Sequence, residues 1–126
     1  MASSVYRMTL IKGDYKEISV KREDASANRV PFSGHIVRFT IRNFEDSAAL
    51  VTLTSADPAQ IKVPELHDAA PAAADIGTAL IKISSTQTSS FPLASLLYDV
   101  EVEQVATGNK TTILRGTINV LEEITR

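Results

Sequence analysis

The chain contains no cysteine and no tryptophan among its 126 residues. The absence of cysteine excludes disulfides, thiolate metal ligands and cysteine nucleophiles. The chain also has no large excess of either charge, since it contains 13 Lys and Arg residues and 15 Asp and Glu residues. The net charge of −2 argues against nucleic acid as a partner, because phosphate contacts need a basic face. No apolar run approaches the roughly 18 residues that span a bilayer, so no membrane partner is expected either.

Glycine and proline are scarce as well, with 5 of each scattered singly along the chain. No flexible linker therefore divides it, and its length predicts a single domain over residues 1–126. The first ten residues lack the basic region and apolar stretch of a secretory signal. The one biased stretch is the Ala/Pro-rich segment at about 64–75, PELHDAAPAAAD, which is predicted to be a loop.

The residues that are abundant favour strands, since 33 of the 126 are Val, Ile or Thr. The clearest strand is predicted over His35–Arg42, where apolar and polar residues alternate strictly. A second alternation over Leu97–Val105 places apolar residues on the opposite face from Asp99, Glu101 and Glu103. The predicted core therefore includes Val37, Phe39, Tyr98, Val100 and Leu114.

Weaker patterns complete the predicted fold. Further strands are expected over Val5–Ile11, Lys16–Arg22, Ala49–Thr54, Gln60–Val63, Ile76–Ser84 and Thr111–Leu121. On the last of these, one face is expected to carry Thr112, Leu114, Ile118 and Val120, with Gly116 marking a bulge or a close packing point. Ser85–Ser90 could hold one helical turn. Seven or eight short strands separated by turn signals predict an all-β, antiparallel β-sandwich.

A search for catalytic or cofactor-binding residues finds none. Glu65, His67 and Asp68 would need a fourth ligand from elsewhere to hold a metal, so neither a metal nor another cofactor is predicted. Asp99, Glu101 and Glu103 share one outward strand face, which is typical of a soluble surface rather than of an acid/base pair. Neither a G-x-S-x-G elbow nor a glycine-rich phosphate loop exists. The sequence predicts a protein that is not an enzyme.

The segment at about 64–75 is the best candidate for contact with a partner, because it is long for a connection inside a compact domain. Its Ala and Pro content supplies apolar contact area at low side-chain entropy cost. The predicted contact residues are Pro64, Glu65, Leu66, His67, Asp68 and Pro71. The alternative is a loose, solvated connection that binds no partner, and the sequence favours neither of these two possibilities.

The order of motifs resembles the N-terminal domain family of the baseplate upper protein of tailed bacteriophages. The similar elements are the early strand running into Lys12-Gly13-Asp14, Pro31–Gly34 before His35–Arg42, Ile76–Ser84, Ser85–Ser90, Leu97–Val102 and Gly116–Arg126. The ending TINVLEEITR also resembles that of small phage virion proteins. The resemblance runs from about Tyr6 to Arg126 and departs from the family at Pro64–Asp75, which is longer here.

This resemblance implies an immunoglobulin-like β-sandwich that serves as a docking module and has no catalytic residues. The expected function is that of a structural virion protein, made in the bacterial cytoplasm, which docks onto other virion subunits of the tail, baseplate or neck. Virions are symmetric, so many copies and a homo-oligomer or symmetric assembly are expected. The alternative is a capsid decoration or cement protein on the head. A carbohydrate-binding module is a weaker third reading, because only seven aromatic residues are present to form a sugar platform.

Overall fold

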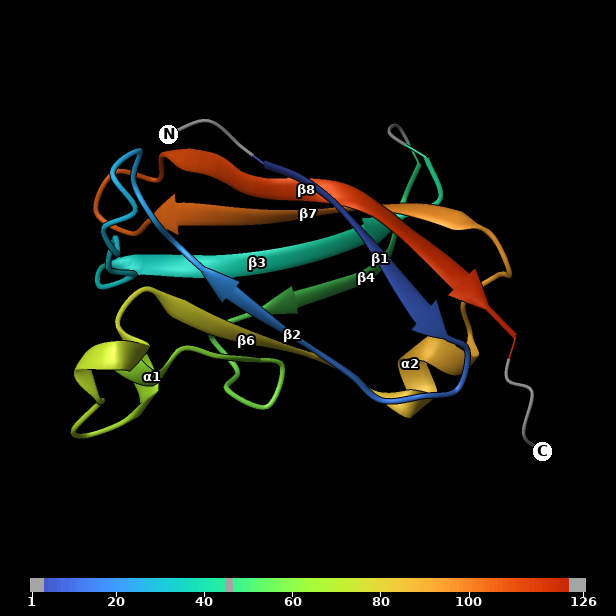
Figure 1. Ribbon diagram of the computed structural model, residues 1–126, viewed down its shortest axis with the longest axis horizontal. Helices are drawn as coiled ribbons and strands as arrows, with labels where there is room; N and C mark the ends of the chain where they lie inside the picture. The colour runs from blue at the N-terminus through green and yellow to red at the C-terminus, as the bar shows by residue number, and fades with distance from the viewer. Residues whose placement is uncertain (1–3, 45–46, 123–126) are drawn as a thin grey trace.

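The computed structural model describes residues 4–44 and 47–122, and this part of the chain is built mainly of strands (Figure 1). The strands are β1 (Ser4–Ile11), β2 (Lys16–Lys21), β3 (His35–Arg42), β4 (Ala49–Thr54), β5 (Ile61–Lys62), β6 (Thr78–Ile83), β7 (Ser95–Gln104) and β8 (Lys110–Leu121). The helical segments are α1 (Pro64–His67), a 3₁₀ turn (Ala73–Asp75) and α2 (Ser85–Ser89). The all-β prediction is confirmed. The closing residues 123–126 of the TINVLEEITR motif lie outside the described residues.

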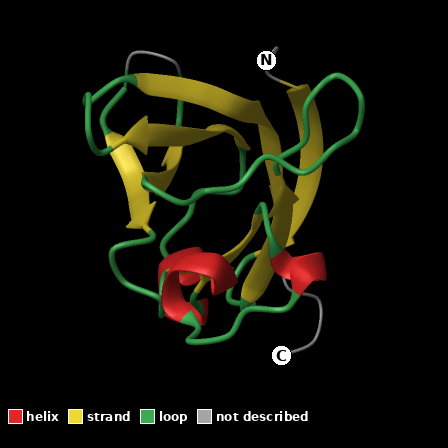
Figure 2. Cartoon of the chain, turned by 90° about the vertical axis from the view of Figure 1, so that its left-hand side faces the viewer, coloured by secondary structure: helices red, strands yellow, loops and turns green. Residues whose placement is uncertain are grey.

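Two sheets pack around one hydrophobic core. The larger sheet has the strand order β1-β8-β7-β3-β4, and the smaller one has the order β2-β6-β5. In Figure 2 the helical segments lie at the lower edge of these strands. None of the helices in residues 4–44 and 47–122 is long and apolar enough to cross a membrane. The buried residues of the core come from strands of both sheets, as in a sandwich.

The centre of the core lies between β3, β7 and β6. Phe39 of β3 is fully buried, and its ring centroid lies 5.7 Å from that of Tyr98 on β7. The fully buried residues of β6 face them from the smaller sheet. Four of the five predicted core residues are buried, and the fifth, Leu114, is partly buried and packs against the cluster. Alternation along β3 and β7 thus identified their buried faces correctly.

The prediction of a purely antiparallel sandwich is wrong for one pair of strands. β1 runs parallel to β8, with Ser4 opposite Leu114 and Ile11 opposite Leu121. The chain leaves β1 for the smaller sheet and returns to the larger sheet at β3, so the first and last strands lie in the same sheet and β2 lies in the other. Alternation within a strand says nothing about a partner more than a hundred residues away. β1 therefore joins the larger sheet instead of pairing with its neighbour β2.

A β-bulge corrects the predicted register of β8. Val100 lies opposite Leu114, whereas Glu101 lies opposite Thr112, so Ile113 is an extra residue. Ile113 is 8% exposed, while Thr112 shares the outer face with Glu101. The prediction that Thr112 shares the inner face is therefore wrong. Gly116 pairs in regular register with Tyr98, away from this bulge.

The predicted helical turn is confirmed as α2, which is fixed by a capping box. The Ser84 hydroxyl accepts a hydrogen bond from the Gln87 N–H, and the Gln87 side chain accepts one from the Ser84 N–H. The buried Thr88 hydroxyl accepts from the Gly13 N–H and donates to the Asp14 carbonyl. These bonds attach α2 to the turn between β1 and β2.

Candidate functional site

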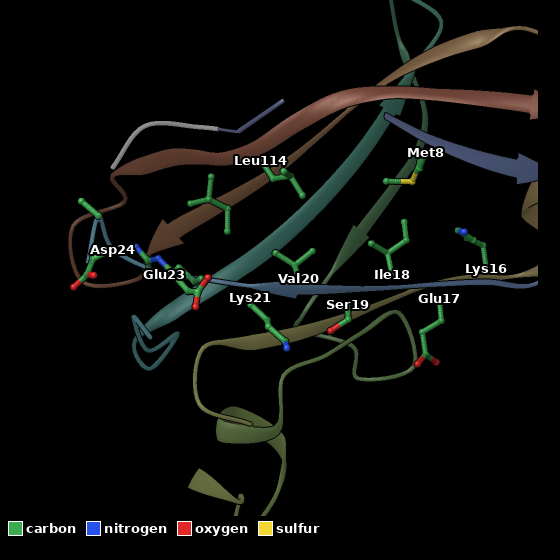
Figure 3. A pocket seen from close by; sticks show the side chains of 13 residues that line it. Met8, Lys16, Glu17, Ile18, Ser19, Val20, Lys21, Glu23, Asp24 and Leu114 are labelled. Carbon is green, nitrogen blue, oxygen red and sulfur yellow. The ribbon is translucent and has the colours of Figure 1, made fainter. Parts of the chain in front are cut away.

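A groove of about 750 Å³ lies beside β2, between this strand and the β1–β8 edge of the other sheet (Figure 3). Its apolar lining comes from three strands: Met8 of β1, Ile18 and Val20 of β2, and Ile113 and Leu114 of β8. Figure 3 shows Ile18 and Val20 pointing toward β8. The groove is thus a continuation of the sandwich core that opens to solvent at one edge.

The rim of the groove is charged and comes mainly from β2 and the residues after it. Its charged members are Lys16, Glu17, Lys21, Arg22, Glu23 and Asp24. In Figure 3 the side chains of Glu17, Ser19 and Lys21 point away from the apolar lining. Both signs of charge are present, so the groove does not favour a strongly charged ligand of either sign.

The outer edge of β2 carries backbone groups without a strand partner in residues 4–44 and 47–122. Lys82 of β6 lies opposite Glu17, but its N–H donates to the Gln60 carbonyl on the β5 side. One residue after the end of β2, the Arg22 N–H donates to the Gly77 carbonyl just before β6. In an antiparallel ladder, alternate residues turn both backbone groups toward the same neighbour. The even-numbered residues of β2 therefore bond to β6. The residues whose N–H and C=O groups turn outward are Glu17, Ser19 and Lys21.

Two exposed side chains of opposite charge mark this edge. Glu17 and Lys21 are both exposed and lie on the same face of β2. The Tyr15 hydroxyl donates a hydrogen bond to Glu17 Oε2 at 2.8 Å. This bond raises the pKa of Tyr15 above its ordinary value, because ionising the hydroxyl would break it and place two negative charges together. Lys21 makes no ion pair in the described structure.

The predicted contact segment is held in place by its own polar side chains. Glu65 Oε2 accepts a hydrogen bond from the Gly77 N–H at 2.6 Å, and Glu65 Oε1 accepts one from the Phe32 N–H. His67 Nδ1 accepts from the Val63 N–H at 2.8 Å, so Nε2 carries the proton and donates to the Ser55 carbonyl at 2.7 Å. Both side chains thus serve the fold, and the segment is an ordered connection.

The other predicted contact residues differ in how much surface they leave free. Pro64 is buried at the start of α1, and Pro71 is half-buried. The Asp68 carboxylate lies 2.9 Å from Lys62 Nζ in a solvent-accessible ion pair. Leu66 is 38% exposed and is followed by the exposed alanines 69, 70 and 72–74. Leu66 and these alanines are exposed apolar residues of the segment, and we call them the Leu66 patch.

Arg29 is a further anchor of this segment, and the sequence reasoning missed it. Its Nη1 donates to the carbonyls of Ala74 and Ile76 and to the Thr78 hydroxyl, at 3.1 to 3.2 Å. Arg29 lies in an irregular stretch, so no periodicity signals its role. Arg22 also packs here, with its guanidinium carbon 5.7 Å from the Phe32 ring centroid. Burial lowers the pKa of Arg22, and the nearby Glu65 carboxylate partly opposes this effect.

The three residues weighed as metal ligands do not converge. Both oxygens of Glu65 and both ring nitrogens of His67 are used in hydrogen bonds, and Asp68 turns to Lys62. Within residues 4–44 and 47–122, no group of three His, Asp or Glu side chains is placed to hold a metal ion.

The acidic residues of β7 lie on the outer face of the larger sheet, as predicted. Glu103 pairs with Arg38 of β3. Burial raises the pKa of Asp99, and the negative charge of Glu101 raises it further, while Arg42 lowers it. The face is an open sheet surface rather than a cleft, so it does not enclose a substrate.

The described structure thus offers three surfaces: the groove beside β2, the Leu66 patch and the charged outer face of the larger sheet. None of these three surfaces combines a nucleophile with a neighbouring base in an enclosed site. Comparison with known proteins adds no relationship, since no protein-family model and no curated protein matches the chain.

Proposed function

We propose that this chain is a non-enzymatic structural protein of a bacteriophage virion, in which an immunoglobulin-like sandwich docks onto other virion subunits. The strand order of its two sheets supports the fold in this proposal, and the motif order that resembles the phage baseplate family supports the virion role. If β2 to β8 are lettered B, C, C′, D, E, F and G, the smaller sheet becomes B-E-D and the larger one contains G-F-C-C′. Immunoglobulin domains distribute their strands between two sheets in this way.

The interior is compatible with this assignment. Antibody domains place a Trp of strand C against a disulfide between strands B and F. The chain has no cysteine, and the fully buried Phe39 of β3 packs instead against Tyr98 of β7. The one departure is β1, which lies along β8 and leaves the edge of β2 open. The motif order that resembles the phage baseplate family supports the same fold.

The Leu66 patch is the docking surface that we propose toward other virion subunits. Glu65, His67 and Arg29 fix its backbone, so binding orders little additional chain. A preordered apolar surface loses less conformational entropy on association than a mobile loop does. Its rim carries the Lys62–Asp68 ion pair, which suits the polar border of an interface.

The proposal is tested by locating the protein in purified phage particles. Particles from the phage that encodes the chain are purified on density gradients, and the protein is quantified against the major capsid protein by mass spectrometry. We expect a fixed, symmetric stoichiometry and density for a two-sheet domain in a reconstruction of the particle. Density on the tail, baseplate or neck supports this proposal, whereas density on the head favours a decoration protein. Particles without the protein contradict both.

A pair of matched variants tests the docking surface. Leu66→Asp places a charge in the Leu66 patch, and Val105→Asp places the same charge on a more exposed apolar residue of the β7–β8 hairpin. Each variant is supplied in trans to a phage whose own copy carries a stop codon. We expect Leu66→Asp to bind the particle at least about tenfold more weakly, equivalent to about 1.4 kcal/mol, and therefore to fall in occupancy, and Val105→Asp to match the wild type. Equal occupancy of the two variants would exclude the patch as the docking surface.

A further inference from the structure

We propose that strand β2 is a self-association edge, at which two copies of this chain pair their β2 strands antiparallel around a twofold axis at Ser19. The two smaller sheets would then form one continuous sheet of six strands, β5-β6-β2 followed by the same strands of the second copy in reverse order. This inference does not depend on the virion role, because it uses only the geometry and charges of β2.

The backbone of β2 is suited to this pairing. The outward N–H and C=O groups belong to Glu17, Ser19 and Lys21, three alternate residues of a six-residue strand. In an antiparallel pair, such residues face one another as hydrogen-bonded pairs. Centring the pair on Ser19 matches every outward residue of one copy with an outward residue of the other. Pairing thus satisfies backbone groups that β6 leaves unused.

The side-chain charges select this register among its neighbours. With Ser19 opposite Ser19, each Glu17 lies opposite Lys21 of the second copy, and symmetry produces this ion pair twice. A shift of two residues in one direction places Glu17 opposite Glu23, and a shift in the other direction places Lys21 opposite Tyr15. Opposite charges directly across a pair stabilise a sheet, and like charges destabilise it. Only the centred register contains both ion pairs.

The inner face of the pair is apolar. Ile18 lies opposite Val20 of the second copy, and both belong to the apolar lining of the groove. Ile18 is only partly buried in the single chain, so pairing removes further apolar surface from water. Lys16 would face Arg22, but Arg22 Nη1 donates to the Pro31 carbonyl and its guanidinium carbon lies 5.7 Å from the Phe32 ring centroid. The cation of Arg22 is thus directed away from the twofold axis.

The two edges of the smaller sheet differ in how they resist pairing. β5 has two residues and is followed closely by Pro64, so it offers almost no edge to another strand. β2 is three times as long and carries a lysine near each end, and such charges normally oppose association with unrelated strands. The acidic Glu17 makes these charges complementary to a second copy. The same charges therefore favour self-pairing in the centred register.

Charge exchange within β2 tests the proposal, with self-association of the full chain measured by sedimentation velocity over a concentration series. Glu17→Lys and Lys21→Glu each create two like-charge pairs, and each should weaken dimerisation at least about tenfold, or about 1.4 kcal/mol. The double variant Glu17→Lys/Lys21→Glu restores both ion pairs and should regain wild-type dimerisation. A mixture of the two single variants should form a heterodimer, because each copy then carries the charge that the other lacks. Lys110→Glu, an exposed lysine at the start of β8, is the matched control and should leave dimerisation unchanged.

Three outcomes would overturn the proposal. The first is a wild-type chain that stays monomeric up to about 1 mM, because a dimer weaker than this has less than about 4 kcal/mol of binding free energy. The second is a dimer that Glu17→Lys and Lys21→Glu leave intact while both remain folded by circular dichroism. The third is a double variant that fails to recover although it is folded, since complementarity rather than a particular charge is the basis of the pairing. Dissociation of the wild-type dimer at about 0.5 M salt, together with dissociation of the mixed heterodimer at the same salt concentration, would support the proposal.

Discussion

The connection 63–77 and the strand β2 are both at the surface, yet they use their polar groups in opposite ways. In the connection, Glu65 and His67 direct their side chains inward. They bond backbone groups at both ends of the connection and in the neighbouring loops at Phe32 and Ser55. In β2, the backbone groups of alternate residues turn outward without a strand partner in residues 4–44 and 47–122. The polar groups of the loop are thus used inside the molecule, whereas β2 presents the unpaired groups of an edge strand.

The comparison shows that element type alone does not locate an interaction surface. A loop whose partly buried carboxylate bonds two backbone N–H groups contributes to the stability of the domain, because removing the carboxylate leaves both donors without an acceptor. A strand whose edge faces solvent contributes backbone groups that no internal contact needs. We therefore expect substitutions at the anchors of the connection to change folding, and substitutions on the edge of β2 to change association only.

The largest expected effect comes from Gly77, the point where the connection meets both Glu65 and β2. Its φ is +73°, and an added Cβ would lie 2.9 Å from the Val30 carbonyl oxygen and 3.2 Å from that of Arg22. We expect Gly77→Ala to lower the free energy of unfolding by about 3–5 kcal/mol, because strain adds to a clash with rigid backbone. Chemical denaturation measures this change.

Gly34→Ala is the matched control for this prediction. Its φ is +74°, but an added Cβ would meet nothing within 4 Å. This variant should lose only about 1–2 kcal/mol, the cost of the left-handed conformation alone. Equal losses in the two variants would mean that the connection yields at Gly77, and its description as a fixed unit would then be wrong.

The next effect in size concerns the carboxylate of Glu65. Glu65→Ala removes the acceptor for the N–H groups of Phe32 and Gly77, and we expect a loss of about 2–3 kcal/mol in the free energy of unfolding. Asp68→Ala removes a carboxylate from the same segment, but its ion pair with Lys62 is open to water. That control should lose at most about 0.5 kcal/mol. A Glu65→Ala variant as stable as Asp68→Ala would show that water replaces the carboxylate without cost.

Alternation predicted the strands of the sandwich well because it reports which face of each strand is buried. Val37 and Phe39, and likewise Tyr98 and Val100, are buried as the pattern indicated. The parallel pairing of β1 with β8 was not predictable in this way, since it depends on the sheet to which each strand returns. The bulge at Ile113 was also not predicted, because one extra residue exchanges the inward and outward positions along the strand without changing its composition.

The candidate surfaces were less predictable than the fold. The sequence singled out Glu65, His67 and Asp68 by their chemistry. In the folded chain, Glu65 and His67 bond backbone groups, and Asp68 pairs with a lysine side chain, so none of the three is available as its chemistry suggested. The edge of β2 gave no signal, because Lys16–Lys21 reads as an ordinary half-buried strand. Its edge is open because β1 pairs elsewhere, which is a property of the topology.

The smallest expected effect is on the folding stability of the edge variants. Glu17→Lys and Lys21→Glu alter exposed side chains, and the only described bond between them and the rest of the chain is the solvent-exposed Tyr15–Glu17 hydrogen bond. We expect each to change the free energy of unfolding of the monomer by less than about 0.5 kcal/mol. The measurement is made at a protein concentration well below the dissociation constant of the dimer. Dimerisation stabilises the folded state by mass action and would otherwise add a concentration-dependent increase to the free energy of unfolding. At high concentration the wild type should then melt above the single variants, and this difference should vanish on dilution. A loss above about 1 kcal/mol that persists on dilution would place Glu17 or Lys21 among the groups that hold the domain together, and the contrast between the two regions would fail.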